Sequence, residues 1–301
     1  MLQYAKTDWL HMLVSPRGSF SPGLMRRVFA FGAIAAALWL AHRWHPRVVL
    51  SVGLYEVAGA VIALILAFRT NTSYDRFWEG RTLWGSIVNA SRNLDRVVRA
   101  HAAVDDDAAR ALATWVVVFA HASRRSLRAE PERPEVDRLL PEPARAALAA
   151  HPHPPLHAAA QVSAALAGFV RRGELDPMMA ARAEAEVMVL VNCLGGCERI
   201  RKTPTPLGYV LLLRRMVALY LATLPLGLVE TVGVLTPAVT MMVAYAVLMI
   251  EGLGHELDDP FGHHPNDLAL SHITDTIERD LLGSSSLDLV LASTSRFPYE
   301  D

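Results

Sequence analysis

Residues 48–68, VVLSVGLYEVAGAVIALILAF, decide the fold class, because they form an apolar run in which Glu56 is the one charged side chain. A helix needs about 20 largely apolar residues to cross a bilayer, and this run has that length. Residues 28–41, VFAFGAIAAALWLA, lie just before it and carry no charge. Together the two runs predict a helical hairpin that crosses a membrane twice.

A second pair of uncharged runs lies late in the chain, MVALYLATLPLGLV at 216–229 and TVGVLTPAVTMMVAYAVLMI at 231–250. All four runs could instead be buried core helices of a large soluble protein, but their arrangement in two close pairs favours membrane hairpins. The 301 residues are 52% apolar and 20% charged, which excludes a disordered chain. Two cysteines cannot form a disulfide scaffold, and the net charge of −1 gives no field that would attract nucleic acid.

Arginines flank the apolar runs and predict their orientation. They precede the first and third runs and follow the second, as Arg26, Arg27, Arg69, Arg76, Arg214 and Arg215. The positive-inside rule places these ends in the cytoplasm, so we expect an inner-membrane protein with both termini cytoplasmic. Residues 1–20 contain no continuous apolar stretch, and no cleavable signal peptide is expected.

The middle of the chain predicts a helical cytosolic region with few strands. Three aspartates, Asp105 to Asp107, suit a helix start, and Asp176-Pro177 opens a second long helix. Between these helices a proline-rich stretch predicts a break. We therefore predict an all-α integral membrane protein with four transmembrane helices and a large cytosolic part. The predicted segments are 1–27 (cytosolic), 28–80 (first hairpin), 81–205 (cytosolic), 206–252 (second hairpin) and 253–301 (cytosolic tail).

Residues 68–94, FRTNTSYDRFWEGRTLWGSIVNASRNL, mix aromatic and charged side chains directly after the second run. The stretch could be an interfacial anchor, or a helix that leaves the membrane and supports a pore. TNTSYDRFWEGRTLWG resembles the signature of the bestrophin family, and GHELDDPFGHHPNDLALSHITDTIERDLL resembles a second family block. Asp176-Pro177 and Arg17-Gly18-Ser19 match the family as well, in the same order along the chain.

The resemblance implies a homopentameric ion channel with one pore along the five-fold axis. The family's apolar neck falls on Ala60, Leu64 and Phe68, and its cytosolic aperture falls on Met178. Five copies of such a row form apolar rings that can gate by dewetting. Ala60 is small where relatives carry a bulky residue, so Leu64 and Phe68 are expected to form the constriction. From spacing alone, such a row is more often simple packing, and it is the resemblance that favours pore lining.

The resemblance to bacterial members implies passive conduction of monovalent cations such as sodium or potassium, without calcium. Glu56 could attract cations in an outer vestibule, pair with an arginine such as Arg43, or lie in the interface, and Glu230 is a weaker candidate of the same kind. The alternatives are an anion channel of the same architecture and a non-conducting membrane scaffold. Where animal relatives hold calcium, this chain has His263, His264, Pro265, Asn266 and Asp267, a poor set for an ion that prefers several hard oxygens.

The remaining histidines and cysteines suggest no resident cofactor. His151, His153 and His157, like His255, His263 and His264, match no closed zinc motif; solvated loop histidines are favoured, although adventitious zinc could bind. Cys193 and Cys197 flank two glycines and are expected at a tight helix contact as free thiols. No catalytic motif appears, so we do not expect an enzyme. The predicted partners are other copies of the chain, membrane lipid and small ions.

Overall fold

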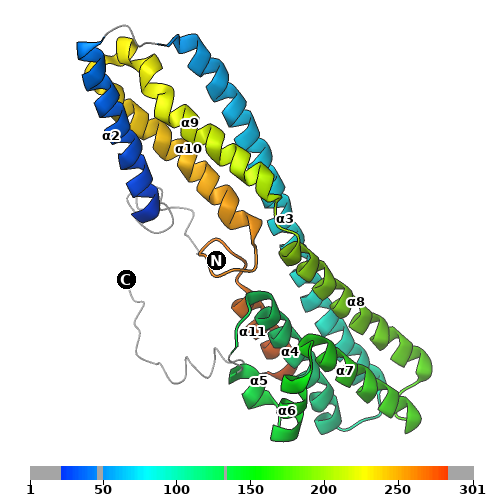
Figure 1. Cartoon of the computed structure of the whole chain (residues 1–301). Helices are drawn as coiled ribbons and strands as arrows, with labels where there is room; N and C mark the ends of the chain where they lie inside the picture. The colour runs from blue at the N-terminus through cyan, green and yellow to red at the C-terminus, as the bar shows by residue number, and fades with distance from the viewer. Residues whose placement is uncertain (1–21, 46–49, 132–133, 284–301) are drawn as a thin grey trace, which may run out of the picture. The chain divides into compact units, whose positions relative to one another are not determined.

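The computed structural model describes residues 22–45, 50–131 and 134–283, and these residues form helices and connecting turns without a strand (Figure 1). The predicted all-α class is therefore confirmed. The chain divides into two compact units. Arg17-Gly18-Ser19, Arg47 and the tail 284–301 lie outside the described residues.

The first unit contains α2 (Pro22–Trp44), α9 (Leu207–Val232), α10 (Thr236–Asp258) and the first half of α3 (Val52–His101). Figure 1 shows α2, α9 and α10 side by side. Their core is aliphatic and includes two residues of α3, Ile62 and Leu66. The other buried members are Val28, Leu213, Val217, Leu221, Ala244 and Leu248.

Three stretches of the described residues are long and apolar enough to cross a membrane: α2, α3 and residues Leu207–Asp258. The third contains two helices, since α9 ends at Val232 and the short 3₁₀ turn Gly233–Leu235 leads into α10. Gly233 has φ of 55°, a conformation that glycine adopts without strain. The two predicted hairpins therefore correspond to α2 with α3 and to α9 with α10.

The helix α3 runs unbroken over 50 residues, from the apolar run through the whole of the mixed aromatic and charged stretch. The sequence from Arg69 to His101 contains no proline, so nothing interrupts its backbone hydrogen bonds. The interpretation as a helix that continues beyond the apolar run is therefore confirmed. The predicted segment boundary between residues 80 and 81 falls inside this helix.

The second unit is a helical bundle of α4 (Asp106–Arg128), α7 (Pro154–Arg171), α8 (Pro177–Lys202), α11 (Leu270–Leu282) and the second half of α3. Asp105 caps α4 by accepting a hydrogen bond from Ala108 N, and Asp176 caps α8 by accepting from Met178 N and Met179 N. Both predicted helix starts are thus confirmed, with side chains that satisfy amide groups that the helix leaves free.

The proline-rich stretch is more ordered than the predicted break. It holds two short helices, α5 (Pro134–Leu139) and α6 (Glu142–Ala150), and leads into α7 at Pro154. Each of these helices has a proline in its first turn, where the missing N–H group has no helical partner to lose. The prolines therefore mark helix starts within the stretch.

Candidate functional site

The predicted neck residues Ala60, Leu64 and Phe68 form a row on an exposed face of α3. Leu64 is 55% exposed and Phe68 is 59% exposed in the single chain, and Ala60 is exposed as well. A step of four residues turns a helix by about 40°, so the three side chains follow one another along the axis. Ile62 and Leu66 lie on the opposite face and are buried in the core. The row is therefore not part of this chain's own packing.

The same row has polar ends. Glu56 lies one step before Ala60 and Thr72 lies one step after Phe68, and both are exposed. Thr72 Oγ1 donates a hydrogen bond to the carbonyl oxygen of Phe68 at 3.0 Å. Asp75, also exposed, lies about three turns beyond Leu64 and therefore close to the same face. Asp75 was not among the predicted ion-attracting residues, although its spacing from the row could have revealed it.

The two predicted ion-attracting carboxylates are both exposed, Glu56 near the start of α3 and Glu230 near the end of α9. Among the ion pairs of the described residues none joins Glu56 to Arg43. Arg43 instead places its guanidinium 5.9 Å from the ring centroid of Trp39. The alternative in which Glu56 is neutralised by Arg43 is thus not what the structure shows.

A buried charge cluster, which we call the Arg69 cluster, follows the neck on the opposite face of α3. Arg69 is 3% exposed, and its Nη1 lies 3.9 Å from Glu251 Oε1. Arg214 Nε donates to the same oxygen at 3.0 Å. The nitrogens of the Arg69 guanidinium find no hydrogen-bond partner among the described residues. Two arginines therefore face one carboxylate, so the cluster itself carries one more positive than negative charge.

The predicted aperture residue Met178 is 78% exposed in the first turn of α8. Its amide donates to Asp176 Oδ1 at 2.8 Å, which fixes the backbone from which the side chain projects. An apolar side chain at a rigid helix start, with nothing of this chain packed over it, suits a contact with other copies or a position in a passage.

The run at the family's calcium position is engaged in internal contacts. Asp267 is buried and its Oδ2 accepts a hydrogen bond from His264 N at 2.6 Å, while Asn266 donates to Glu256 Oε2 at 2.8 Å. Burial raises the pKa of the Asp267 carboxyl, against the opposing effect of the His264 amide. The side chains of Asn266 and Asp267 thus stabilise the turn.

The histidines of the proline-rich stretch are structural and not simply solvated, which corrects the prediction. His153 caps α7 by accepting from Leu156 N at 3.2 Å, and its Nε2 lies 2.8 Å from Glu198 Oε1. His151 Nδ1 in turn accepts from His153 N at 3.0 Å. These rings serve the helix start, because a ring nitrogen can satisfy an otherwise unpaired amide.

The two cysteines are free and buried, as predicted. A Cβ atom at Gly196 would lie 2.8 Å from Leu83 Cδ1, so the two helices meet closely there and a larger residue would require the Leu83 side chain to shift. Burial raises the pKa of the Cys197 thiol to about 12, and nearby Cys193 and Glu79 act in the same direction. The thiols are therefore protonated and unreactive at neutral pH.

Comparison with known proteins agrees with this geometry. The sequence model of a family described as "Bacterial/Fungal Bestrophin protein" matches residues 1–283. A "Voltage-dependent anion channel-forming protein" of Ralstonia nicotianae is 35% identical over 93% of this chain and 94% of its own length. A protein of the same name from Escherichia coli K12, YneE, is 31% identical over 94% of this chain and 93% of its own length. A solved bestrophin homolog from Klebsiella pneumoniae has a TM-score of 0.83 at 31% identity, over 87% of this chain and 98% of its own.

Proposed function

This chain belongs to the bacterial bestrophin family, and from that premise we propose that it forms a homopentameric channel for passive conduction of small monovalent ions. The family is one of channel-forming membrane proteins, which agrees with the membrane-length helices of this chain. We further propose an inner-membrane location, surrounded by lipid, with both termini in the cytoplasm. The protein would do no covalent chemistry.

The observation that carries this proposal is the exposed row on α3. Leu64 and Phe68 lie on the face of the helix that points away from the core of their own chain. More than half of each side chain is exposed in the single chain, and such an apolar surface favours contact with lipid or with other copies of the chain. The exposed carboxylate of Asp75, which lies close to the side of α3 that carries Leu64, favours a water-filled passage over a lipid-facing surface. Five copies would then form rings at the neck, with Leu64 and Phe68 narrowest, and a separate ring at Met178.

For the conducted ion we propose cations such as sodium or potassium. The exposed charged side chains of α3 between Val52 and Asp75 are both carboxylates, Glu56 and Asp75. In a symmetric pentamer each position becomes a ring of five negative charges, which raises the local concentration of cations. Glu230 would add to this field if it also faces the outer mouth.

A second candidate is anion conduction through the same architecture, because the curated relatives are named as anion channel-forming proteins. The Arg69 cluster agrees with this alternative, since its two arginines outnumber the single Glu251. The two candidates differ in which set of charges the permeating ion meets. Arg69 is buried and the carboxylates of α3 are exposed, which is why we favour cations.

A planar-bilayer recording of the purified full chain in asymmetric potassium chloride tests both statements. We expect single-channel steps with a reversal potential displaced toward the potassium equilibrium potential. Displacement toward the chloride equilibrium potential would establish the anion candidate and contradict ours. Absence of steps, together with no ion flux from protein-containing liposomes above that of empty liposomes, would instead indicate a non-conducting scaffold.

A further inference from the structure

The Arg69 cluster reaches the surface of the first unit through one of its members. Arg69 on α3 is 3% exposed and Glu251 on α10 is 4% exposed. The side chain of Arg214 on α9 is 48% exposed. Arg214 Nε donates to Glu251 Oε1 across the contact of α9 with α10. The cluster therefore has a buried interior and an accessible guanidinium at its edge.

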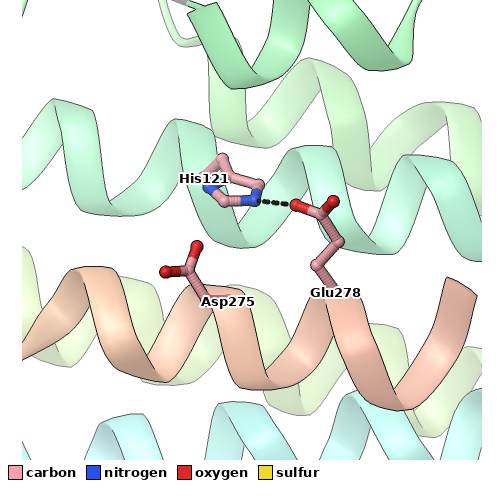
Figure 2. A group of neighbouring side chains, drawn as sticks. All are labelled: His121, Asp275 and Glu278. Carbon is pink, nitrogen blue, oxygen red and sulfur yellow. Dashed lines mark hydrogen bonds and ion pairs between the residues drawn. The ribbon is translucent and has the colours of Figure 1, made fainter. Parts of the chain in front are cut away.

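A buried carboxylate of the second unit shows how a buried charge is matched by neighbours. Figure 2 shows the Glu278 carboxylate directed at the His121 ring, and His121 Nε2 lies 3.0 Å from Glu278 Oε2. Arg138 Nη2 donates to the other oxygen of Glu278, Oε1, at 2.7 Å. Each oxygen of this carboxylate thus has its own partner.

Arg69 has no comparable match. Its Nε, Nη1 and Nη2 are all buried and find no hydrogen-bond partner among the described residues. The nearest carboxylate oxygen is Glu251 Oε1, 3.9 Å from Nη1, and this oxygen already accepts from Arg214. One carboxylate between two arginines leaves one positive charge uncompensated within the cluster, and such a charge is costly where water is excluded. An anion at the accessible edge of the cluster would compensate it.

Arg214 has donors left for such an anion. Its one hydrogen bond among the described residues runs from Nε to Glu251. A guanidinium has five N–H groups in a planar fork, so the two Nη groups remain for a second partner. Such a fork suits phosphate, whose oxygens it contacts through two parallel hydrogen bonds. Arg215, the next residue, is exposed as well and places a second cation beside the first.

The surface around Arg214 is apolar. Leu207, Leu211 and Leu219 are between 40% and 70% exposed. Because a helix rises 1.5 Å per residue, Leu207 lies about 10 Å before Arg214 along α9 and Leu219 lies about 8 Å beyond it. The arginine thus lies within an exposed apolar surface and not at its end. A phospholipid offers both acyl chains for the leucines and phosphate for the arginine, whereas free phosphate offers only the second.

From these observations we propose that Arg214 and Arg215 bind the phosphate group of an anionic phospholipid, with the buried Arg69 adding positive charge behind them. This lipid site rests on the proposed membrane location, in which the arginine-flanked ends of the apolar helices face the cytoplasm. Basic positions between membrane helices on that side bind anionic headgroups. The bound phosphate would neutralise the excess charge of the cluster, so this charge would not act on the permeating ion.

Lipid retention by the purified full chain tests the proposal. Because no current is recorded, a protein that fails to conduct still gives a result in this test. The protein is held in detergent micelles with equal amounts of phosphatidylglycerol and phosphatidylcholine, and native mass spectrometry counts the lipids that stay bound. We expect phosphatidylglycerol to be retained about five-fold over phosphatidylcholine, since one arginine near an anionic membrane surface adds an attraction of that order.

Two outcomes of this measurement would overturn the proposal. Equal retention of the two lipids would mean that the cluster does not recognise an anionic headgroup. Release of phosphatidylglycerol by millimolar inorganic phosphate would identify free phosphate, and not a lipid, as the ligand.

Variants with opposite expected effects separate the charge of the cluster from general lipid binding. Arg214→Gln removes the accessible donor and should bring the two lipids close to equal retention. Glu251→Gln removes the one negative charge of the cluster and should increase the preference for phosphatidylglycerol. Arg182→Gln is the matched control, an exposed arginine on α8 in the second unit, and should leave the preference unchanged. An unchanged preference in Arg214→Gln, or a decrease in folded Glu251→Gln, would overturn the proposal.

Discussion

The first half of α3 and the helix α4 are both rich in apolar residues, but the single chain buries those of α4 and leaves many of those on α3 exposed. Val116 to Phe119 on α4 are all 0% exposed, whereas Leu64 and Phe68 on α3 remain more than half exposed. The second unit therefore completes its own core, as a soluble bundle does. The first unit does not, and its outward apolar surface requires lipid or further copies of the chain.

The buried charges differ between the two regions in the same way. In the second unit Glu135 meets two arginines, with Arg124 Nη2 at 2.9 Å and Arg125 Nη1 at 3.2 Å, and each carboxylate oxygen has a donor. In the first unit Arg69 has only a 3.9 Å approach to Glu251. Unpaired buried polar atoms occur in both units, so the exposed apolar surface is the feature that sets the first region apart. Assembly in a membrane would cover the exposed apolar surface of the first unit.

The largest expected effect on stability comes from α4. Phe119→Ala should lower the free energy of unfolding by about 3–5 kcal/mol, because the ring is fully buried and its removal leaves a cavity. Leu64→Ala, the corresponding substitution on the exposed row, should change the free energy of unfolding by less than about 1 kcal/mol. Thermal unfolding in detergent, followed by helical circular dichroism, measures both. Equal losses in the two variants would contradict the contrast between the helices.

Acid should destabilise the second unit through Glu135. Burial alone would raise the pKa of this carboxyl, but the hydrogen bonds and charges of Arg124 and Arg125 outweigh it and lower the pKa from 4.5 to about 2. A carboxyl group whose pKa is lowered by folding stabilises the folded state fully above pH 4.5, and this contribution is lost as the pH falls from 4.5 toward 2. At neutral pH the interactions of Glu135 with the two arginines therefore add up to about 3 kcal/mol to the free energy of unfolding.

Glu135→Gln should therefore lower stability at pH 7 and flatten its dependence on pH between 4.5 and 2. Urea unfolding at several pH values measures this. Glu142→Gln is the matched control, since the Glu142 side chain is 76% exposed in its pair with Arg145. An unchanged acid profile for Glu135→Gln would show that this carboxyl does not carry the effect.

Conduction should respond to the row on α3. The double variant Leu64→Ala/Phe68→Ala should raise single-channel conductance or open probability several-fold, because shorter apolar side chains let the constriction wet more easily. Leu219→Ala on α9 is the control, as Leu219 is 67% exposed but lies outside the row. Bilayer recordings compare the two. Unaltered currents in a folded oligomer of the double variant would remove these residues from the neck.

The smallest expected effect concerns selectivity. Glu56→Gln removes the carboxylate at the start of the row and should move the reversal potential in asymmetric potassium chloride toward zero by a few millivolts. Glu230→Gln should move it less, because that residue lies on α9 away from the row. A reversal potential that both substitutions leave unchanged would mean that neither carboxylate lies near the permeating ion.

Apolar run length and helix-capping chemistry predicted much of the fold. The Asp105 and Asp176 caps and the three membrane-length apolar stretches of the described residues follow from local rules that the sequence displays directly. The proline-rich stretch was predicted as a break, because proline marks both helix starts and loops and local pattern does not separate the two.

The candidate sites were less predictable. The neck row depended on a family resemblance, since its spacing alone more often indicates packing. His121 on α4 is at least 154 positions from Asp275 and Glu278 on α11, so only tertiary packing brings these three buried side chains together. The Arg69 cluster likewise joins three helices, and no local signal in the sequence links Arg69 with Glu251.

The central claim, that the exposed face of α3 lines a passage, is tested most directly by cysteine accessibility during bilayer recording. Leu64→Cys channels should lose most of their current when a water-soluble cationic methanethiosulfonate reagent is added. Ile62→Cys on the buried face should be unaffected, as should the unmodified protein, whose two thiols are buried. Equal insensitivity of Leu64→Cys and Ile62→Cys, or block of the Ile62→Cys channel alone, would contradict the claim.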